Sequence, residues 1–161
     1  MADQTTPLTR EQINARMGRV PLFAVFMWAD GDYDPETSWR SELQSEYLRW
    51  QLDLQDRGLL LAAGPLDYDL DVRDPARPLG MYILAVGSKD EAQRIADQEP
   101  FFRSGLRKHL VSAYFLNEGT AIAEGRRLLA DRVKQPDTSP SSNTASAEAV
   151  DPPRSATEAK R

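Results

Sequence analysis

The residue best suited to do chemistry is Glu99, which stands between a predicted helix end and Pro100 and is followed by two phenylalanines. If these apolar neighbours bury the carboxyl group, desolvation raises its pKa and makes it a usable proton donor or acceptor near neutrality. The alternatives are a solvated carboxylate at a turn and a carboxylate bonded to backbone amides. The residues alone favour these alternatives, so Glu99 is at first only a candidate.

A second candidate is Tyr47, whose phenol can donate a hydrogen bond to a substrate oxygen or a developing oxyanion. Tyr47, Trp50 and Leu54 recur at spacings of three and four, so they share one helical face. Aromatic residues at this spacing more often fill the core. A tyrosine is also a poor base at neutral pH, because its ordinary pKa is about 10. Any proton transfer would therefore depend on Glu99.

Aromatic side chains are available to line a pocket that accepts a ring, although they equally suit a hydrophobic core. The candidates are Phe26, Trp28, Trp39 and Trp50, with Phe101 beside Glu99. Gly64 and Pro65, which end a short apolar stretch, are the expected pocket floor. Our candidate substrate contacts are thus Trp28, Trp50, Gly64, Pro65 and Phe101.

The chain contains a single histidine, His109, which shares one face of a predicted strand with Val111. A structural histidine with satisfied hydrogen bonds is the favoured interpretation. One histidine without cysteine supplies no ligand set for a protein-bound metal. The aspartates between Asp67 and Asp74 lack the glycine and the closing glutamate of a calcium-binding EF-hand loop. We expect no metal and no cofactor, and we find no phosphate loop, dinucleotide fingerprint or nucleophile elbow.

Composition indicates one domain with appendages. The chain has 161 residues, is 40% hydrophobic, and concentrates its apolar residues between Val20 and Leu116. The net charge of -5 argues against a nucleic-acid partner. The lack of cysteine excludes disulfides and fits a reducing compartment. The first ten residues lack the apolar core of a signal peptide, and no run reaches transmembrane length. We expect a cytoplasmic protein that has no membrane partner.

The first half of the chain contains signals for two helices and two strands. Thr9 and Gln12 form a capping-box pattern, which predicts a short helix over Arg10–Met17. The following elements are a strand over Val20–Ala29, apolar on both faces, a helix over about Ser38–Arg57, and a buried strand over Leu59–Ala63. Gly58 suits the left-handed turn that ends a helix, and Pro65 ends the second strand.

The second half follows a polar loop over Asp67–Pro78. The predicted elements are a strand over Gly80–Val86, a capped helix from Ser88 to about Gln98, a strand over Lys108–Leu116, and a helix over about Thr120–Lys134. Gly125 lowers the propensity of the last helix by roughly 1 kcal/mol relative to alanine. From Gln135 onward the composition predicts disorder.

This order predicts an α+β, ferredoxin-like βαββαβ fold with a four-stranded antiparallel sheet and extra N- and C-terminal helices. Two core helices cover one face of the sheet, yet three of its strands are apolar on both faces. A second copy related by a two-fold axis is the simplest cover for the other face, so we expect a homodimer with a barrel-like core. The expected divisions are an N-terminal extension (1–19), the core domain (20–117), a C-terminal helix (118–134) and a disordered tail (135–161).

The core from Val20 to about Leu116 resembles the YciI (YCII-related) family of dimeric α+β barrel proteins. Four stretches in this order and spacing support the resemblance: DRGLLLAAGPL from Asp56, GMYIL from Gly80, SKDEA from Ser88 and DQEPFFRSGL from Asp97, the last followed by a strand that contains HLV. Typical members begin directly at the first strand.

The resemblance implies a suspected site made of a histidine on the first core helix and an acid before the proline of the last motif. In this sequence Tyr47 stands at the histidine position and Glu99 at the acid position. It also implies that a few members act on hydroxylated or chlorinated aromatic breakdown products without a cofactor.

Two hypotheses follow. In the first, the protein is a cofactor-free enzyme for isomerisation, elimination or hydrolysis of a small cyclic or aromatic oxygenated metabolite, with Glu99 as acid/base and Tyr47 as polarising donor. In the second, it is a non-catalytic dimer that binds a small molecule or a partner and has lost the family's histidine. The retained acid favours the first hypothesis, and the missing histidine favours the second.

Overall fold

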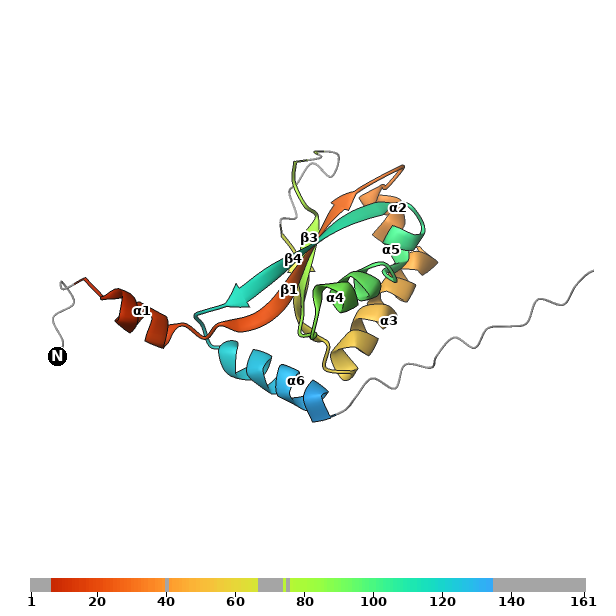
Figure 1. Ribbon diagram of the computed structural model, residues 1–161. Helices are drawn as coiled ribbons and strands as arrows, with labels where there is room; N and C mark the ends of the chain where they lie inside the picture. Colours follow the sequence, from red (N-terminus) through yellow and green to blue (C-terminus); the bar gives the residue numbers. More distant parts are fainter. Residues whose placement is uncertain (1–6, 40, 67–73, 75, 135–161) are drawn as a thin grey trace, which may run out of the picture.

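The computed structural model describes residues 7–39, 41–66, 74 and 76–134 and has an α+β architecture (Figure 1). Four strands form an antiparallel sheet in the order β2-β3-β1-β4. The elements are α1 (Arg10–Arg16), β1 (Val20–Ala29), α2 (Pro35–Trp39), α3 (Glu42–Asp56), β2 (Leu60–Pro65), β3 (Gly80–Leu84), α4 (Lys89–Ala96), α5 (Pro100–Arg103), β4 (Arg107–Leu116) and α6 (Ile122–Lys134). This order confirms the predicted ferredoxin-like βαββαβ arrangement.

Strand β1 organises the sheet, because it pairs with β3 on one side and β4 on the other. Val25 lies opposite Tyr82 of β3 and Val111 of β4, so these three side chains point to the same face. Side chains alternate along a strand, so Ala24 and Phe26 point to the other face.

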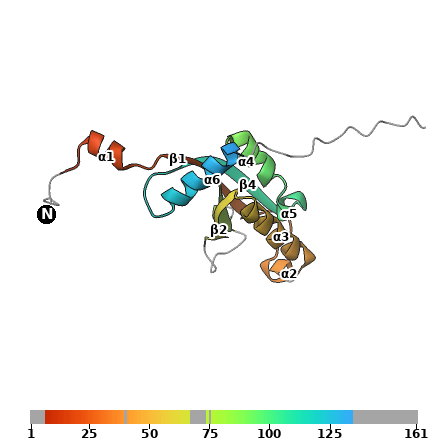
Figure 2. The same ribbon diagram turned by 90° about the horizontal axis from the view of Figure 1, so that it is seen from below.

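Helices α3 and α4 cover the face that carries Val25, and both lie on the same side of the sheet in Figures 1 and 2. The core between these layers consists of Val25, Met27, Leu54, Leu59, Tyr82, Leu84, Val86, Ala92, Ile95, Ala96 and Val111. Burial of this layer favours folding, at about 25 cal/mol per Å² of apolar surface removed from water.

The helix predicted over Ser38–Arg57 is in fact two helices, which corrects that prediction. Helix α2 ends at Trp39, and the Ser41 hydroxyl caps a new helix by accepting from the Gln44 N–H at 3.3 Å. The other end is as predicted: Gly58 has φ 67° and the Leu59 N–H donates to the Leu54 carbonyl at 2.8 Å. This is a Schellman turn, and β2 begins directly after it.

The prediction of a buried second strand is also wrong in part. Strand β2 lies at the sheet edge and runs to Pro65, and its residues from Ala62 onward are exposed. Pro65 pairs with Gly80 and is tolerated because an edge strand has no neighbour on its outer side. Leu59, which precedes the strand, is the residue that is fully buried.

The second face of the sheet is covered at one end by α6. The cluster there consists of Val20, Leu22, Ala85, Leu116 and Leu128. Gly125 explains how the helix comes so close, since a Cβ at this position would lie 3.3 Å from Val20 Cγ1. Beyond this cluster, Phe26 and Trp28 are half-buried and Leu110 is 55% exposed, so part of this face lies open.

Several predictions lie outside the described residues, namely those for residues 67–73 and 75 of the aspartate loop, the side chain of Trp39 and the tail from Gln135. Within the described ranges, no helix combines the length and apolar character needed to cross a bilayer.

Candidate functional site

The candidate site lies where the turn between α4 and α5 faces the start of β4. Asp97 is the C-cap of α4, and Glu99 is the N-cap of α5. Arg107 and His109 alternate on β4 and so point to the face that these helices cover. Two side-chain pairs result: an ion pair between Arg107 and Glu99, and a hydrogen-bonded pair between His109 and Asp97.

Glu99 is a buried carboxylate with two kinds of partner. Its Oε2 accepts from the Phe102 backbone N–H at 2.5 Å, and its Oε1 accepts from Arg107 Nη1 at 3.2 Å. The side chains of Glu99 and Arg107 are 2% and 10% exposed. This geometry matches the sequence-based alternative of a carboxylate bonded to backbone amides, and it adds a buried ion pair that the sequence analysis did not include.

Arg107 is held among three aromatic rings. Its guanidinium carbon lies 4.1 Å from the ring centroid of Phe101, 4.9 Å from that of Tyr47 and 5.3 Å from that of Tyr33. Nη2 also donates to the Tyr33 hydroxyl at 3.3 Å. Ring faces attract a desolvated cation strongly, so the charge of Arg107 is retained in the interior.

The electrostatic balance at Glu99 has opposing contributions. Burial raises the pKa of Glu99 above its usual value, while the Arg107 charge and the backbone N–H donors of Phe101 and Phe102 lower it, and burial prevails. The carboxyl group is thus shifted towards the neutral range in which acid/base catalysis is efficient.

Tyr47 joins this site through the contact of its ring with the Arg107 guanidinium. Its side chain is buried, stacks on Trp50 and contacts Phe101 edge-on. The Tyr47 hydroxyl oxygen accepts from Gln51 Nε2 at 2.8 Å. Burial raises the pKa of Tyr47, so the phenol stays protonated and can act as a hydrogen-bond donor.

A third phenol, that of Tyr82, lies beneath Trp50 at a ring-centroid distance of 5.6 Å. It is 1% exposed, and its hydroxyl has no hydrogen-bond partner among the described residues. Burial and the Glu99 charge raise the pKa of Tyr82 well above its usual value. An unpaired buried hydroxyl is costly, which marks this spot as one where a polar ligand atom would gain a hydrogen bond.

His109 is the partner of Asp97 in the second pair. With its proton on Nε2 it donates to Asp97 Oδ1 at 3.1 Å, and its ring packs on Phe102. Nε2 also lies 2.9 Å from Gln93 Nε2. Nδ1 is buried without a partner among the described residues, so only one of the two ring nitrogens is satisfied. Burial lowers the pKa of His109, and Asp97 partly opposes this shift.

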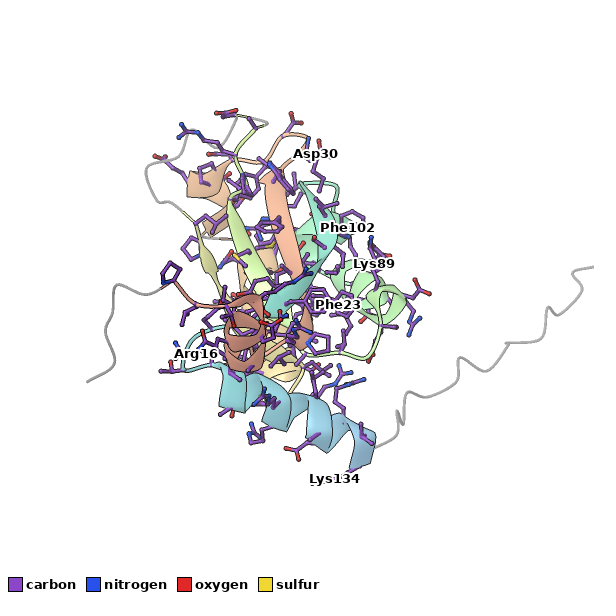
Figure 3. The ribbon with its side chains drawn as sticks, turned by 60° about the vertical axis from the view of Figure 1, so that its left-hand side comes forward. Arg16, Phe23, Asp30, Lys89, Phe102 and Lys134 are labelled. Carbon is purple, nitrogen blue, oxygen red and sulfur yellow. The ribbon has the colours of Figure 1, made fainter. Side chains whose placement is uncertain are left out.

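The structure brings four of the predicted site residues together: Glu99, Tyr47, Trp50 and Phe101. It places the other three elsewhere. Gly64 and Pro65 are exposed on the edge strand β2, and Trp28 lies opposite Lys108 on the sheet face away from α3 and α4. Figure 3 shows Phe102 and Lys89 on the same flank of the sheet, where α4 and α5 lie.

Sequence reasoning missed Arg107, Tyr33 and Tyr82. A signal for Arg107 was present in the sequence. Arg107, His109 and Val111 occupy alternate positions of one strand, so their side chains point to the same face, which is the core face because Val111 is apolar.

The described surface includes a cleft of about 400 Å³ between the end of α3 and α6 and a cleft of about 320 Å³ between α3 and β2; Glu99 and Arg107 line neither of these two. The side chains of Glu99 and Arg107 are almost fully covered by the surrounding residues. In the part of the chain that the structure describes, no three acidic, histidine or cysteine side chains gather to hold a metal ion.

The family model of the YCII-related domain matches residues 25–112, more than half of the chain. The match confirms the resemblance drawn from the motifs. One similar solved structure is 5-chloro-2-hydroxyhydroquinone dehydrochlorinase from Burkholderia phenoliruptrix AC1100 in complex with 2,5-dihydroxybenzoquinone. It is 18% identical, has a TM-score of 0.43, and the similarity covers 58% of this chain and 92% of that one. No curated protein matches.

Arg107→Met tests the ion pair. We expect a loss of about 3–5 kcal/mol of unfolding free energy, because Glu99 is left buried and unpaired. Without Arg107 the folded-state pKa of Glu99 rises further, and stability that depends on a raised carboxyl pKa is lost as pH increases. Urea unfolding should therefore show a larger deficit at pH 8 than at pH 5. Arg107→Met combined with Glu99→Gln should remove this pH dependence; if it persists, Glu99 is not its source.

His109 can be followed alone by NMR, since it is the only histidine. We expect its ring signal in the folded protein to titrate below the value seen in urea, because burial disfavours the charged ring. Its contribution to stability is therefore full above the unfolded pKa of about 6.5 and is lost as pH falls. Asp97→Asn should lower the folded pKa further; an increase would contradict the pairing of His109 with Asp97.

Proposed function

The chain belongs to the YCII-related domain family, and from this membership and the buried Glu99–Arg107 pair we propose that it is a cofactor-free enzyme that transfers protons on a small cyclic or aromatic oxygenated metabolite. The observation that carries the proposal is the desolvated Glu99 carboxyl, 2% exposed and with a raised pKa, beside a fixed cation. Such a pair combines a proton acceptor with a group that stabilises negative charge.

The site's surroundings suit a planar substrate with an oxygen next to the reacting carbon. Arg107 Nε has no partner among the described residues and is available to a developing oxyanion. The Tyr47 oxygen already accepts from Gln51, so its own proton is free to donate to a substrate oxygen. The rings of Tyr33, Tyr47 and Phe101 supply the apolar walls.

The proposed reaction begins when the Glu99 carboxylate takes a proton from a carbon beside a carbonyl, and the electron pair moves onto the oxygen near Arg107. In an isomerisation, protonated Glu99 returns the proton to another carbon. In an elimination, a leaving group departs with its electron pair. In a hydrolysis, Glu99 instead takes a proton from the water that attacks the carbonyl, and it gives this proton to the oxygen that departs when the acyl C–O bond of the ester or lactone breaks. Each course needs one carboxyl group with a pKa near neutrality.

Substrate entry requires a side chain to move, because Glu99 is covered. We assign this role to Tyr33, which is half-buried just before α2 and whose side chain makes a single hydrogen bond among the described residues, to Arg107. Displacement of a ring at a loop is a small rearrangement of the kind that commonly opens enzyme sites.

The second candidate function is a non-catalytic dimer that binds a small molecule or a partner. The observation in its favour is that both Glu99 oxygens already have protein partners. In that case the ion pair serves only to cap α5 and to fasten it to β4.

A deuterium-exchange assay distinguishes the two functions. Lactones and hydroxylated aromatics are incubated with the protein in D₂O, and carbon-bound deuterium and product are followed by NMR. We expect exchange or conversion of at least one compound, and a loss of roughly 100-fold or more in Glu99→Gln, which retains an acceptor for the Phe102 N–H. Glu124→Gln, an exposed carboxylate, is the matched control and should leave the rate unchanged. Binding without exchange in the wild type would support the non-catalytic function.

We also propose a homodimer in which the open part of the second sheet face packs on the same face of another copy. Phe26, Trp28 and Leu110 supply an apolar surface there that the α6 cluster does not include. Continuous apolar surface on a sheet face is typical of an interface.

The missing cysteines agree with the cytoplasm as the compartment that we propose.

Two matched substitutions on β4 test this interface. Leu110 and Phe115 are 55% and 59% exposed and lie on opposite faces of the strand. Leu110→Glu should weaken self-association in sedimentation analysis, because it places a charge in the apolar contact. Phe115→Glu should leave the mass unchanged. A wild-type monomer, or equal effects of both substitutions, would refute this interface.

A further inference from the structure

Helix α1 buries none of its residues against the rest of its own chain. It has seven residues, a complete capping box between Thr9 and Gln12, and no buried residue. In Figures 1 and 2 it projects away from the sheet and from α3. Isolated helices shorter than about 12–15 residues are marginal in water, so a helix of this length needs a surface to pack on.

The base of α1 is fixed even though the helix itself projects. The Gly18 N–H donates to the Asn117 carbonyl at 2.6 Å, and Arg126 Nη2 donates to the Gly18 carbonyl at 3.0 Å. A Cβ at Gly18 would lie 2.8 Å from Ile122 Cδ1, so this contact is tight. Arg19 reaches back to Asn14 at 2.7 Å. These contacts tie the base of α1 to the end of β4 and to α6.

The projecting helix carries an apolar strip with a basic border. Leu8 and Ile13 occupy the two positions of a hydrophobic staple and are still 46% and 40% exposed. Met17 follows Ile13 by one turn on the same side. Arg10 and Arg16 flank Ile13 at spacings of three, and they have no ion-pair partner among the described residues.

The same chain has an apolar groove that nothing within it fills. This is the cleft of about 320 Å³ between α3 and β2, lined by Leu48, Gln51, Leu52, Gln55, Leu60, Leu61, Ala62 and Ala63. Leu48 and Leu52 are 47% and 55% exposed.

The charge at the end of this groove is complementary to α1. The last turn of α3 contains no basic residue, although the C-terminal end of a helix favours cations. Arg57, the C-cap of α3, is paired with Asp53, and the exposed Asp56 has no ion-pair partner among the described residues. Arg49 also adjoins Leu52, on the side towards the start of α3. An arginine of α1 therefore fits best at the Asp56 end.

We propose that α1 of one copy packs into the α3–β2 groove of a second copy, reciprocally, in a two-fold dimer. Helix and groove are matched in apolar character and in charge, yet they lie apart within one chain. Residues 25–112, which match the family model, do not include α1, so the exchange belongs to this chain's own extension. It does not depend on catalysis at Glu99.

The absence of cysteine allows a clean cross-linking test. Ile13→Cys and Leu52→Cys are made in separate full-length chains, one with an added tag, then mixed and mildly oxidised. The mixed disulfide should form at least roughly tenfold faster than the one between Ile13→Cys and Phe115→Cys, because binding raises the effective concentration of the first pair. Ile13 and Leu52 are surface side chains, so folding is retained, and circular dichroism verifies it.

Equal rates for the two mixtures would overturn the proposal. A single chain that carries both Ile13→Cys and Leu52→Cys should form a covalently closed dimer. A monomer with an internal disulfide, or a ladder of higher oligomers, would contradict the reciprocal exchange. The readout is separate from the deuterium assay, so the failure of one leaves the other intact.

Discussion

The contact between Glu99 and Arg107 determines how the helical layer meets the sheet. Removing two charges from water is expensive, and such a pair is tolerated only where other groups complete its hydrogen bonds. Here the Phe102 backbone N–H donates a hydrogen bond to the Glu99 carboxylate. The Tyr33 hydroxyl accepts one from the Arg107 guanidinium, which also lies against three aromatic rings. The start of α5, the start of β4, the loop before α2 and the inner face of α3 must therefore meet at one point. The catalytic proposal rests on this convergence.

Much of the fold was predictable because its local signals are strong and agree with one another. The capping patterns at Thr9 and Ser88 begin helices, Gly58 ends one, and the apolar run of β1 is the central strand. The errors arose where tertiary context decides. Nothing in the composition of the stretch that follows Pro35 distinguishes one helix from two, since the break depends on the Ser41 cap. The exposure of β2 depends on its place at the sheet edge, which apolar content does not reveal.

The site was only partly accessible from the sequence. Helical spacing placed Tyr47 and Trp50 on one face, and the motif around Pro100 identified Glu99. Arg107 was missed because a basic residue at a strand start is ordinarily solvated, and only its parity with Val111 turns it inward. The same parity separates Trp28 from the Glu99 cluster by the full thickness of the sheet. His109 was expected to be satisfied, but a period-two pattern gives the direction of a side chain and not the partners of its two nitrogens.

The double attachment of Glu99 has an evolutionary consequence. A residue that both caps a helix and neutralises a buried arginine is retained by selection for folding alone, whether or not a substrate is ever bound. Position 47 is less constrained, since Tyr47 contributes ring packing, including its contact with Arg107, but neither caps a helix nor neutralises a buried charge. Gain or loss of activity among descendants of this chain would therefore appear first as a change at position 47, while position 99 stays the same.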